Sequence, residues 1–168
     1  MKVELPVTDI EFRKVKTTRS VMFPLYSGSQ WHLNQSEFAM QVEGVASFYV
    51  CNGREVEYAP VDGVTLESLE LFLNGSVYGA ILHQRNILPL HGSSFIRNGQ
   101  SIMICGGSGA GKSSLTAAFC MNGAQFLTDD VTPVVFFKGK PVIMPLSDRI
   151  KLWGDSLQQL NQNKNNLT

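Results

Sequence analysis

One short segment constrains this chain more than any other, because eight consecutive residues fit the pattern G-x-x-x-x-G-K-[ST]. An apolar run, QSIMIC at 100–105, precedes the segment, and a helix-like stretch at 112–122 follows it and ends before Gly123. From average residue usage, the probability of a chance match somewhere in the chain is on the order of 1%. The pattern predicts a loop between a buried strand and a helix N-terminus, formed by Gly106, Gly107, Ser108, Gly109, Ala110, Gly111, Lys112 and Ser113.

Such a loop has the composition that phosphate binding requires. Glycines let successive backbone N–H groups point inward, and a helix N-terminus adds partial positive charge. In this pattern the lysine, Lys112, bridges the β- and γ-phosphates, and the hydroxyl of Ser113 binds Mg²⁺. The sequence therefore predicts ATP with Mg²⁺ as the ligand, and a glycine-rich turn without function is the alternative.

Two adjacent carboxylates form the second feature. Asp129 and Asp130 close the apolar segment QFLTD, and Asp129 lies 17 residues after the lysine of the loop. A carboxylate at a strand end beside such a loop can hold Mg²⁺, directly or through water. A second one can then act as the base for an incoming hydroxyl. A helix cap or a turn is the alternative for this pair.

A histidine lies near the same place in the expected topology. The segment LPLHGSSFIR at 88–97 and the run at 100–105 flank Asn98-Gly99, which predicts a hairpin. This hairpin carries His91 to the sheet end where Gly106 lies, near the expected γ-phosphate. A packed or surface histidine is the alternative, and that is how we interpret His32 and His83.

Hairpin and helix signals give the wider organisation. Asn52-Gly53 and Lys138-Gly139 predict two further hairpins, and the apolar run at 102–105 predicts a fully buried central strand. Residues 64–85 predict a helix capped by Thr65, whose two glycines, Gly75 and Gly79, we explain by close packing against another backbone. We expect a β-rich region at 1–87, with its helix at about 65–85, and a P-loop core at 88–168.

Composition excludes several classes of protein. Fourteen basic and fourteen acidic side chains give zero net charge, which argues against a nucleic-acid partner. The chain has no apolar run long enough for a membrane span or a signal peptide, so we expect a cytoplasmic protein. Residues 76–168 carry 8 basic and 4 acidic side chains, a net +4 that an anionic ligand would match, with ordinary scatter of charge as the alternative. The three cysteines, without CxxC spacing, are expected to be reduced and buried.

The segment 89–134, from PLHGSSF to DDVTPV, resembles the catalytic core of the HPr kinase/phosphorylase family. Three features match this family at the same relative positions: the LHG sequence, the loop and the double aspartate. His91 lies 21 residues before Lys112, which lies 18 residues before Asp130. The resemblance implies an α/β fold of the PEP-carboxykinase and HPr-kinase type, a mixed sheet with an embedded P-loop. A β-rich N-terminal region would precede this core.

Members of this family transfer the γ-phosphoryl group of ATP to a serine hydroxyl of a protein, so the implied partner is a protein or peptide bearing a serine. By position, the resemblance makes Asp130 the general base and Lys112 the phosphate clamp. It makes Ser113 a metal ligand and places His91 beside the transferred phosphate. The nucleotide-binding residues run from Gly106 to Ser114, and Asp129 is the second metal ligand that we expect.

Some positions differ from the bifunctional members of the family. Ser114 stands where they carry a glutamate, and their E-x-R-G-x-G segment is absent from this sequence. The resemblance is therefore closer to the monofunctional kinase-like relatives of peptide-modification clusters, and phosphorylase activity is not expected. The core resembles one truncated at its C-terminus, where Arg149 or Lys151 could supply a cation near the phosphates, with a solvated loop pair as the alternative.

Two other functions remain open at this point. The chain could be a non-catalytic, ATP-binding regulatory protein, or it could be a P-loop kinase that phosphorylates a small metabolite. The sequence identifies neither the acceptor nor the oligomeric state, so a homo-oligomer also remains open.

Overall fold

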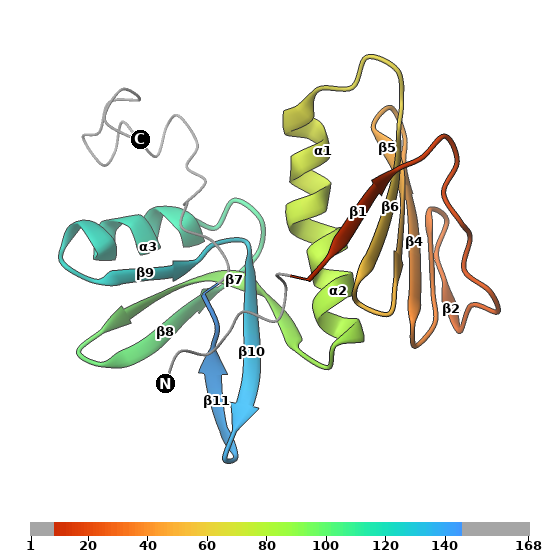
Figure 1. Cartoon of the computed structure of the whole chain (residues 1–168). Helices are drawn as coiled ribbons and strands as arrows, with labels where there is room; N and C mark the ends of the chain where they lie inside the picture. Colours follow the sequence, from red (N-terminus) through yellow and green to blue (C-terminus); the bar gives the residue numbers. More distant parts are fainter. Residues whose placement is uncertain (1–8, 146–168) are drawn as a thin grey trace. The chain divides into compact units, whose positions relative to one another are not determined.

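The computed structural model describes residues 9–145, whose helices and strands are shown in Figure 1. The chain divides into two compact units, Met1–Leu88 and Pro89–Thr168. The described elements form a mixed α/β structure with two sheets and few helices, in which strands predominate. Within this range, no helix has both the length and the apolar content to cross a membrane. Arg149 and Lys151 lie outside the described residues.

The first unit contains a six-stranded sheet with the order β1-β6-β5-β4-β3-β2. Its neighbouring strands are antiparallel except for the parallel pair β1 and β6. Asn52 and Gly53 have φ values of 53° and 60°, which a type I′ turn requires, so the first hairpin is confirmed. The strands are β1 (Glu11–Lys14), β2 (Tyr26–Ser27), β3 (Trp31–Leu33), β4 (Glu37–Val42), β5 (Ala46–Cys51) and β6 (Glu55–Pro60).

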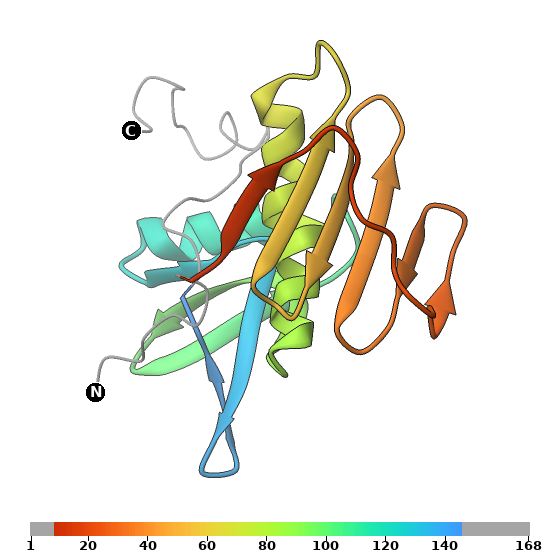
Figure 2. The same cartoon turned by 45° about the vertical axis from the view of Figure 1, so that its right-hand side comes forward.

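One helical segment covers a face of this sheet, as Figure 2 shows. It consists of α1 (Leu66–Phe72), a π-helical turn (Leu73–Val77) and α2 (Tyr78–Gln84). The hydroxyl of Thr65 accepts a hydrogen bond of 3.2 Å from the Ser68 N–H, which confirms the predicted cap. The core between helix and sheet contains Ala46, Phe48, Val50, Val56, Leu69, Val77 and Ile81.

The explanation of the helix glycines by close packing is wrong. A Cβ atom built on Gly75 or on Gly79 has no neighbouring atom within 4 Å. Gly75 lies instead in the π-helical turn, where the regular hydrogen bonding of the helix changes. The backbone freedom of glycine therefore accompanies a local change of helical geometry rather than a tight helix contact.

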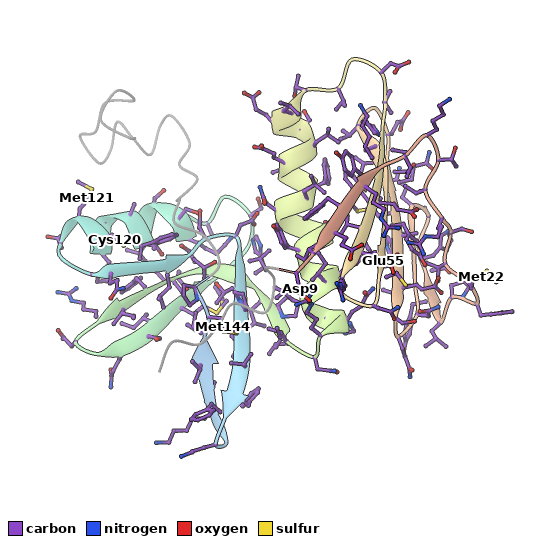
Figure 3. All side chains as sticks on the ribbon, viewed as in Figure 1. Asp9, Met22, Glu55, Cys120, Met121 and Met144 are labelled. Carbon is purple, nitrogen blue, oxygen red and sulfur yellow. The ribbon has the colours of Figure 1, made fainter. Side chains whose placement is uncertain are left out.

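The other face of the first sheet carries a charged network beneath the segment that joins β1 to β2. The Arg19 guanidinium donates to Glu57 and to Glu55, which is labelled in Figure 3, at 2.8 Å each. The same guanidinium lies 4.6 Å from the centre of the Tyr49 ring, which is only 2% exposed. The Tyr49 hydroxyl donates to the Glu37 carboxylate and thereby holds the pKa of Glu37 below its usual value.

The second unit contains a five-stranded sheet with the path β11-β10-β7-β8, and β9 also pairs with β7. The turns Asn98-Gly99 and Lys138-Gly139 both have positive φ values, so the other two predicted hairpins are confirmed. The helix α3 (Lys112–Met121) stacks Phe119 on Phe95 of β7 at 4.6 Å. The strands are β7 (Leu88–Arg97), β8 (Gln100–Cys105), β9 (Gln125–Thr128), β10 (Val131–Phe137) and β11 (Lys140–Ile143).

The prediction of a buried central strand at 102–105 is wrong. In the described part of the chain β8 stands at one end of the sheet path, and its residues are exposed or half-buried. The buried central strand is β7, in which residues 92–95 are all buried although two of them are serines. Apolar composition does not distinguish the two strands of a hairpin, because the neighbours that bury a strand come from distant parts of the chain.

All three cysteines are unpaired. Cys51 and Cys120 are half-buried, and burial raises the pKa of the Cys120 thiol near the end of α3 (Figure 3). Cys105 is exposed, so the expectation of a buried thiol is wrong at this position, because β8 forms an edge of the sheet path.

Candidate functional site

The predicted loop connects the end of β8 to the start of α3, and residues 105–111 are exposed. Gly109 and Gly111 have φ values of 76° and 82°, a left-handed conformation that glycine adopts without a steric cost. Gly111 is the residue before the helix and has no side chain that could cap the first turn. The loop therefore presents glycine backbone at the positive end of a ten-residue helix, an arrangement that favours anions.

The two side chains that follow the loop point to different partners. Lys112 folds back over the loop, and its Nζ donates a hydrogen bond of 2.9 Å to the carbonyl oxygen of Gly107. Ser113 donates from its Oγ to the Asp129 Oδ1 at 2.8 Å. The lysine thus places a cation over the loop, and the serine connects the helix to the acidic turn. Ser114 is half-buried in the first turn of the same helix.

The acidic pair occupies a sharp turn between β9 and β10. Asp130 has a φ of 72°, a left-handed conformation in which aspartate and asparagine are enriched among residues other than glycine. The Val131 N–H donates to the Asp129 carbonyl oxygen at 3.0 Å, and the Thr128 hydroxyl donates to the Val131 carbonyl oxygen at 2.7 Å. This turn lets the two neighbouring carboxylates face different partners.

His91 lies beside the second of these carboxylates. Its Nδ1 is 3.4 Å from the Asp130 Oδ1, and the histidine side chain is 57% exposed. The register of the hairpin pairs Gly92 with Cys105, so His91 lies next to the start of the loop. The structure therefore brings the predicted residues His91, Lys112, Ser113, Asp129 and Asp130 to one end of the second sheet.

Two further residues hold this arrangement together: Gly92 of the LHG sequence, and Thr132, which the sequence did not single out. The Gly92 N–H donates to the Asp130 carbonyl oxygen at 3.1 Å, and the Thr132 hydroxyl donates to the Gly92 carbonyl oxygen at 3.0 Å. A Cβ at Gly92 would lie 2.4 Å from Met103 Cε and 2.7 Å from the Ile104 carbonyl oxygen. Only glycine fits there without displacement. An isolated glycine within a strand was the available signal, since it often marks a close backbone approach.

The donor set suits a small hard cation that arrives with phosphate. Ser113 and Asp129 offer two oxygen donors whose atoms lie 2.8 Å apart. Among residues 9–145, no group of three or more histidine, cysteine or acidic side chains is arranged to hold a metal ion. Mg²⁺ commonly binds through one or two protein oxygens together with substrate phosphates and water. Two protein oxygens are thus compatible with Mg²⁺ whose other ligands are phosphate oxygens or water.

The remaining histidines lie elsewhere. His32 belongs to β3 in the first unit and contacts the Ser27 hydroxyl at 2.9 Å, and His83 is an exposed residue of α2. The cations proposed from the late sequence, Arg149 and Lys151, fall outside the described range. Comparison of the chain with protein-family models, curated proteins and solved structures finds no match.

Proposed function

We propose that the chain binds Mg·ATP at the loop 106–111 and transfers the γ-phosphoryl group to a serine hydroxyl of a protein or peptide. The observation that carries the proposal is the separation of the two aspartates. Asp129 contacts Ser113 at 2.8 Å, and Asp130 lies 3.4 Å from His91. One carboxylate thus contacts the helix that follows the loop, and the other lies beside a histidine.

The glycine loop and the helix N-terminus supply the binding of the nucleotide. Their N–H groups would surround the β-phosphate, and the Lys112 ammonium, now on the Gly107 carbonyl oxygen, would turn toward the β- and γ-oxygens. Ser113 and Asp129 would hold Mg²⁺, which supplies positive charge to the phosphates when bound. The donor atoms of Ser113 and Asp129 support this assignment because both are oxygen atoms, which Mg²⁺ prefers as ligands.

Phosphoryl transfer then requires a base for the acceptor. The serine oxygen forms a bond to the γ-phosphorus while the bond from that phosphorus to the bridging oxygen of ADP breaks, and ADP leaves. The hydroxyl proton passes to the Asp130 carboxylate. His91 would orient this carboxylate and contact the transferring phosphate, and Lys112 would offset the charge that develops on the phosphate oxygens.

The sequence resemblance to the HPr kinase/phosphorylase family supports the same roles, and the fold that we propose for the second unit is the P-loop core of that family. Ser114 replaces the glutamate of the bifunctional members, so we propose transfer to a hydroxyl without phosphorolysis. The assignment of the acceptor to a protein or peptide serine rests on this resemblance alone.

The test is incubation of the full chain with γ-labelled ATP and Mg²⁺ in lysate from the native host. We expect a labelled protein or peptide that disappears with Asp130→Asn, a variant that retains a side chain suited to the left-handed backbone. Nucleotide binding without any transfer would contradict the kinase and favour a regulatory ATP-binding protein. Label on a free small molecule would instead identify a metabolite kinase.

A further inference from the structure

In the described part of the chain, the strand that leads into the loop is paired on one side only. Within residues 9–145, β8 pairs with β7 and stands at the end of the sheet path. Its sequence, QSIMIC, contains no charged residue and no proline. Proteins usually protect an exposed edge with lysine, proline or a bulge, because unpaired N–H and C=O groups can pair with another chain. None of these devices is present in β8.

The register shows which backbone groups of β8 point away from β7. The two-residue turn at Asn98-Gly99 makes Arg97 and Gln100 a hydrogen-bonded pair. Hydrogen-bonded pairs alternate with pairs that point their N–H and C=O groups outward, so the outward groups of β8 belong to Ser101, Met103 and Cys105. A strand added here would pair with these three residues and would end at the first residue of the phosphate loop.

An apolar groove with a cationic end lies beside α3. It has a volume of about 190 Å³ and is lined by Arg97, Leu115, Ala118, Phe119 and Asn122. The Arg97 guanidinium covers the Phe119 ring at 5.2 Å. Ile102 of β8 is the cross-strand partner of Phe95, which stacks on Phe119, so Ile102 shares the face of the sheet that α3 covers. Ile102 and Leu115 are 38% and 48% exposed.

We propose that the acceptor is an extended peptide that pairs with the edge of β8 opposite β7, and this inference rests on the proposed kinase function. Apolar side chains of the peptide would pack on Ile102 and Leu115, and an acidic residue would bind Arg97. We expect the peptide to carry a negative charge because it would complement the Arg97 guanidinium. Between residues 89 and 145 the acidic side chains are Asp129 and Asp130, both at the loop. No carboxylate on β8 or α3 therefore repels an acidic peptide.

The length of β8 sets the spacing within such a peptide. A strand advances about 3.3 Å per residue, so the six residues of β8 span about 17 Å between Gln100 and Cys105. Gln100 lies opposite Arg97, and the loop begins directly after Cys105. The peptide must also cross about three strand spacings of about 4.8 Å, from the outer edge of β8 to Asp130 on the far side of β7. The phosphorylated serine should therefore lie about ten residues from the acidic residue in the peptide sequence.

The experiment measures peptide binding and phosphoryl transfer separately. The probe is a fluorescent synthetic peptide of alternating valine and threonine, with one serine and an aspartate about ten residues apart. Its dissociation constant is measured by fluorescence anisotropy with the full chain and no ATP. Ser101→Pro removes an outward N–H and leaves the pairing with β7, whereas Ser101→Ala keeps that N–H. We expect the dissociation constant to rise about tenfold with proline relative to alanine.

A charge exchange tests whether Arg97 binds the acidic residue of the peptide. Arg97→Glu should weaken binding of the aspartate peptide, and a peptide with lysine in place of the aspartate should restore it. Equal binding by the alanine and proline variants, or no rescue by charge exchange, would overturn the docking proposal even if the peptide is phosphorylated. A dimer that Ser101→Pro converts to a monomer would show that a second copy occupies the edge. Peptide binding without any transfer, with ATP also failing to bind, would refute the kinase function instead.

Discussion

The replacement of Gly92 by alanine tests how the candidate site is held together. A new Cβ at this position would lie 2.7 Å from the Ile104 carbonyl oxygen, which belongs to the backbone of the adjacent strand. The nearer contact, 2.4 Å from Met103 Cε, involves the flexible end of a side chain that can move. The backbone contact therefore determines the cost. Overpacking of this kind destabilises a protein by about 1–3 kcal/mol.

Thermal unfolding followed by circular dichroism measures the effect. For a chain of this size, 1 kcal/mol lowers the melting temperature by about 2–4 °C, so a cost of about 2 kcal/mol predicts a decrease of about 4–8 °C. Adding Met103→Ala should recover only part of the loss, because the Ile104 carbonyl oxygen remains in place. Gly92 also positions Asp130 through its N–H, so phosphoryl transfer should fall more than ATP binding does.

Gly79→Ala is the matched control. A Cβ at Gly79 meets no atom within 4 Å, and this residue lies in the helix α2. Alanine there should stabilise the chain by about 0.4–1 kcal/mol, because it restricts the unfolded state and favours the helix. The same substitution is thus expected to have opposite effects at the two positions. If Gly92→Ala melts at the native temperature, the argument from the close approach of β7 and β8 is wrong.

Three further predictions concern charge. Lys112→Ala should abolish the stabilisation by ATP, which is about 2.7 kcal/mol at a ligand concentration of about 100 Kd, and an unchanged thermal shift would contradict nucleotide binding at the loop. Asp130→Asn should reduce phosphoryl transfer by about 10²–10⁴-fold while the affinity for ATP is retained. Asp129→Asn should instead weaken the dependence of ATP binding on Mg²⁺. Measuring both the transfer of labelled phosphate and the binding of ATP at increasing Mg²⁺ concentrations distinguishes the two variants. Tyr49→Phe should destabilise the first unit at pH 7 by about 1.5–3 kcal/mol. The pKa of Glu37 is lower in the folded state than its value of about 4.5 in the unfolded state. The hydrogen bond from Tyr49 therefore stabilises the protein at pH values above about 4.5, and this stabilisation is lost as the pH falls through the folded pKa of Glu37. Denaturant titrations of both proteins at pH 7 and pH 3 would check this.

Local signals in the sequence were sufficient for the turns and the helix cap. Asn52-Gly53 and Asn98-Gly99 specify type I′ turns because their backbone preferences act within two residues, and Thr65 caps its helix through a hydrogen bond to Ser68. The loop 106–111 is likewise a continuous segment. These features required no knowledge of distant neighbours, and the sequence therefore predicted them.

Features that depend on distant neighbours were not predictable in this way. The exposure of β8 depends on what pairs with its outer edge, and the segments that bury β7 follow it by about thirty residues or more in the chain. The division between the two aspartates depends on the left-handed φ of Asp130 and on the Gly92 N–H, which comes from another strand. Adjacent carboxylates in a sequence do not show which way each one points.

The turn at Asp129 and Asp130 also has a mechanical consequence. A single planar peptide unit joins the two residues, and their Cα atoms are therefore held about 3.8 Å apart. Asp129 contacts the helix that carries the loop, and Asp130 lies beside His91. Each carboxylate still turns about its own χ1 and χ2 bonds, so a change in the contact between Asp129 and Ser113 reaches Asp130 only through the backbone dihedral angles of the turn. The hydrogen bond from the Gly92 N–H to the Asp130 carbonyl oxygen resists such a change, so the two carboxylates can respond separately to what the loop binds.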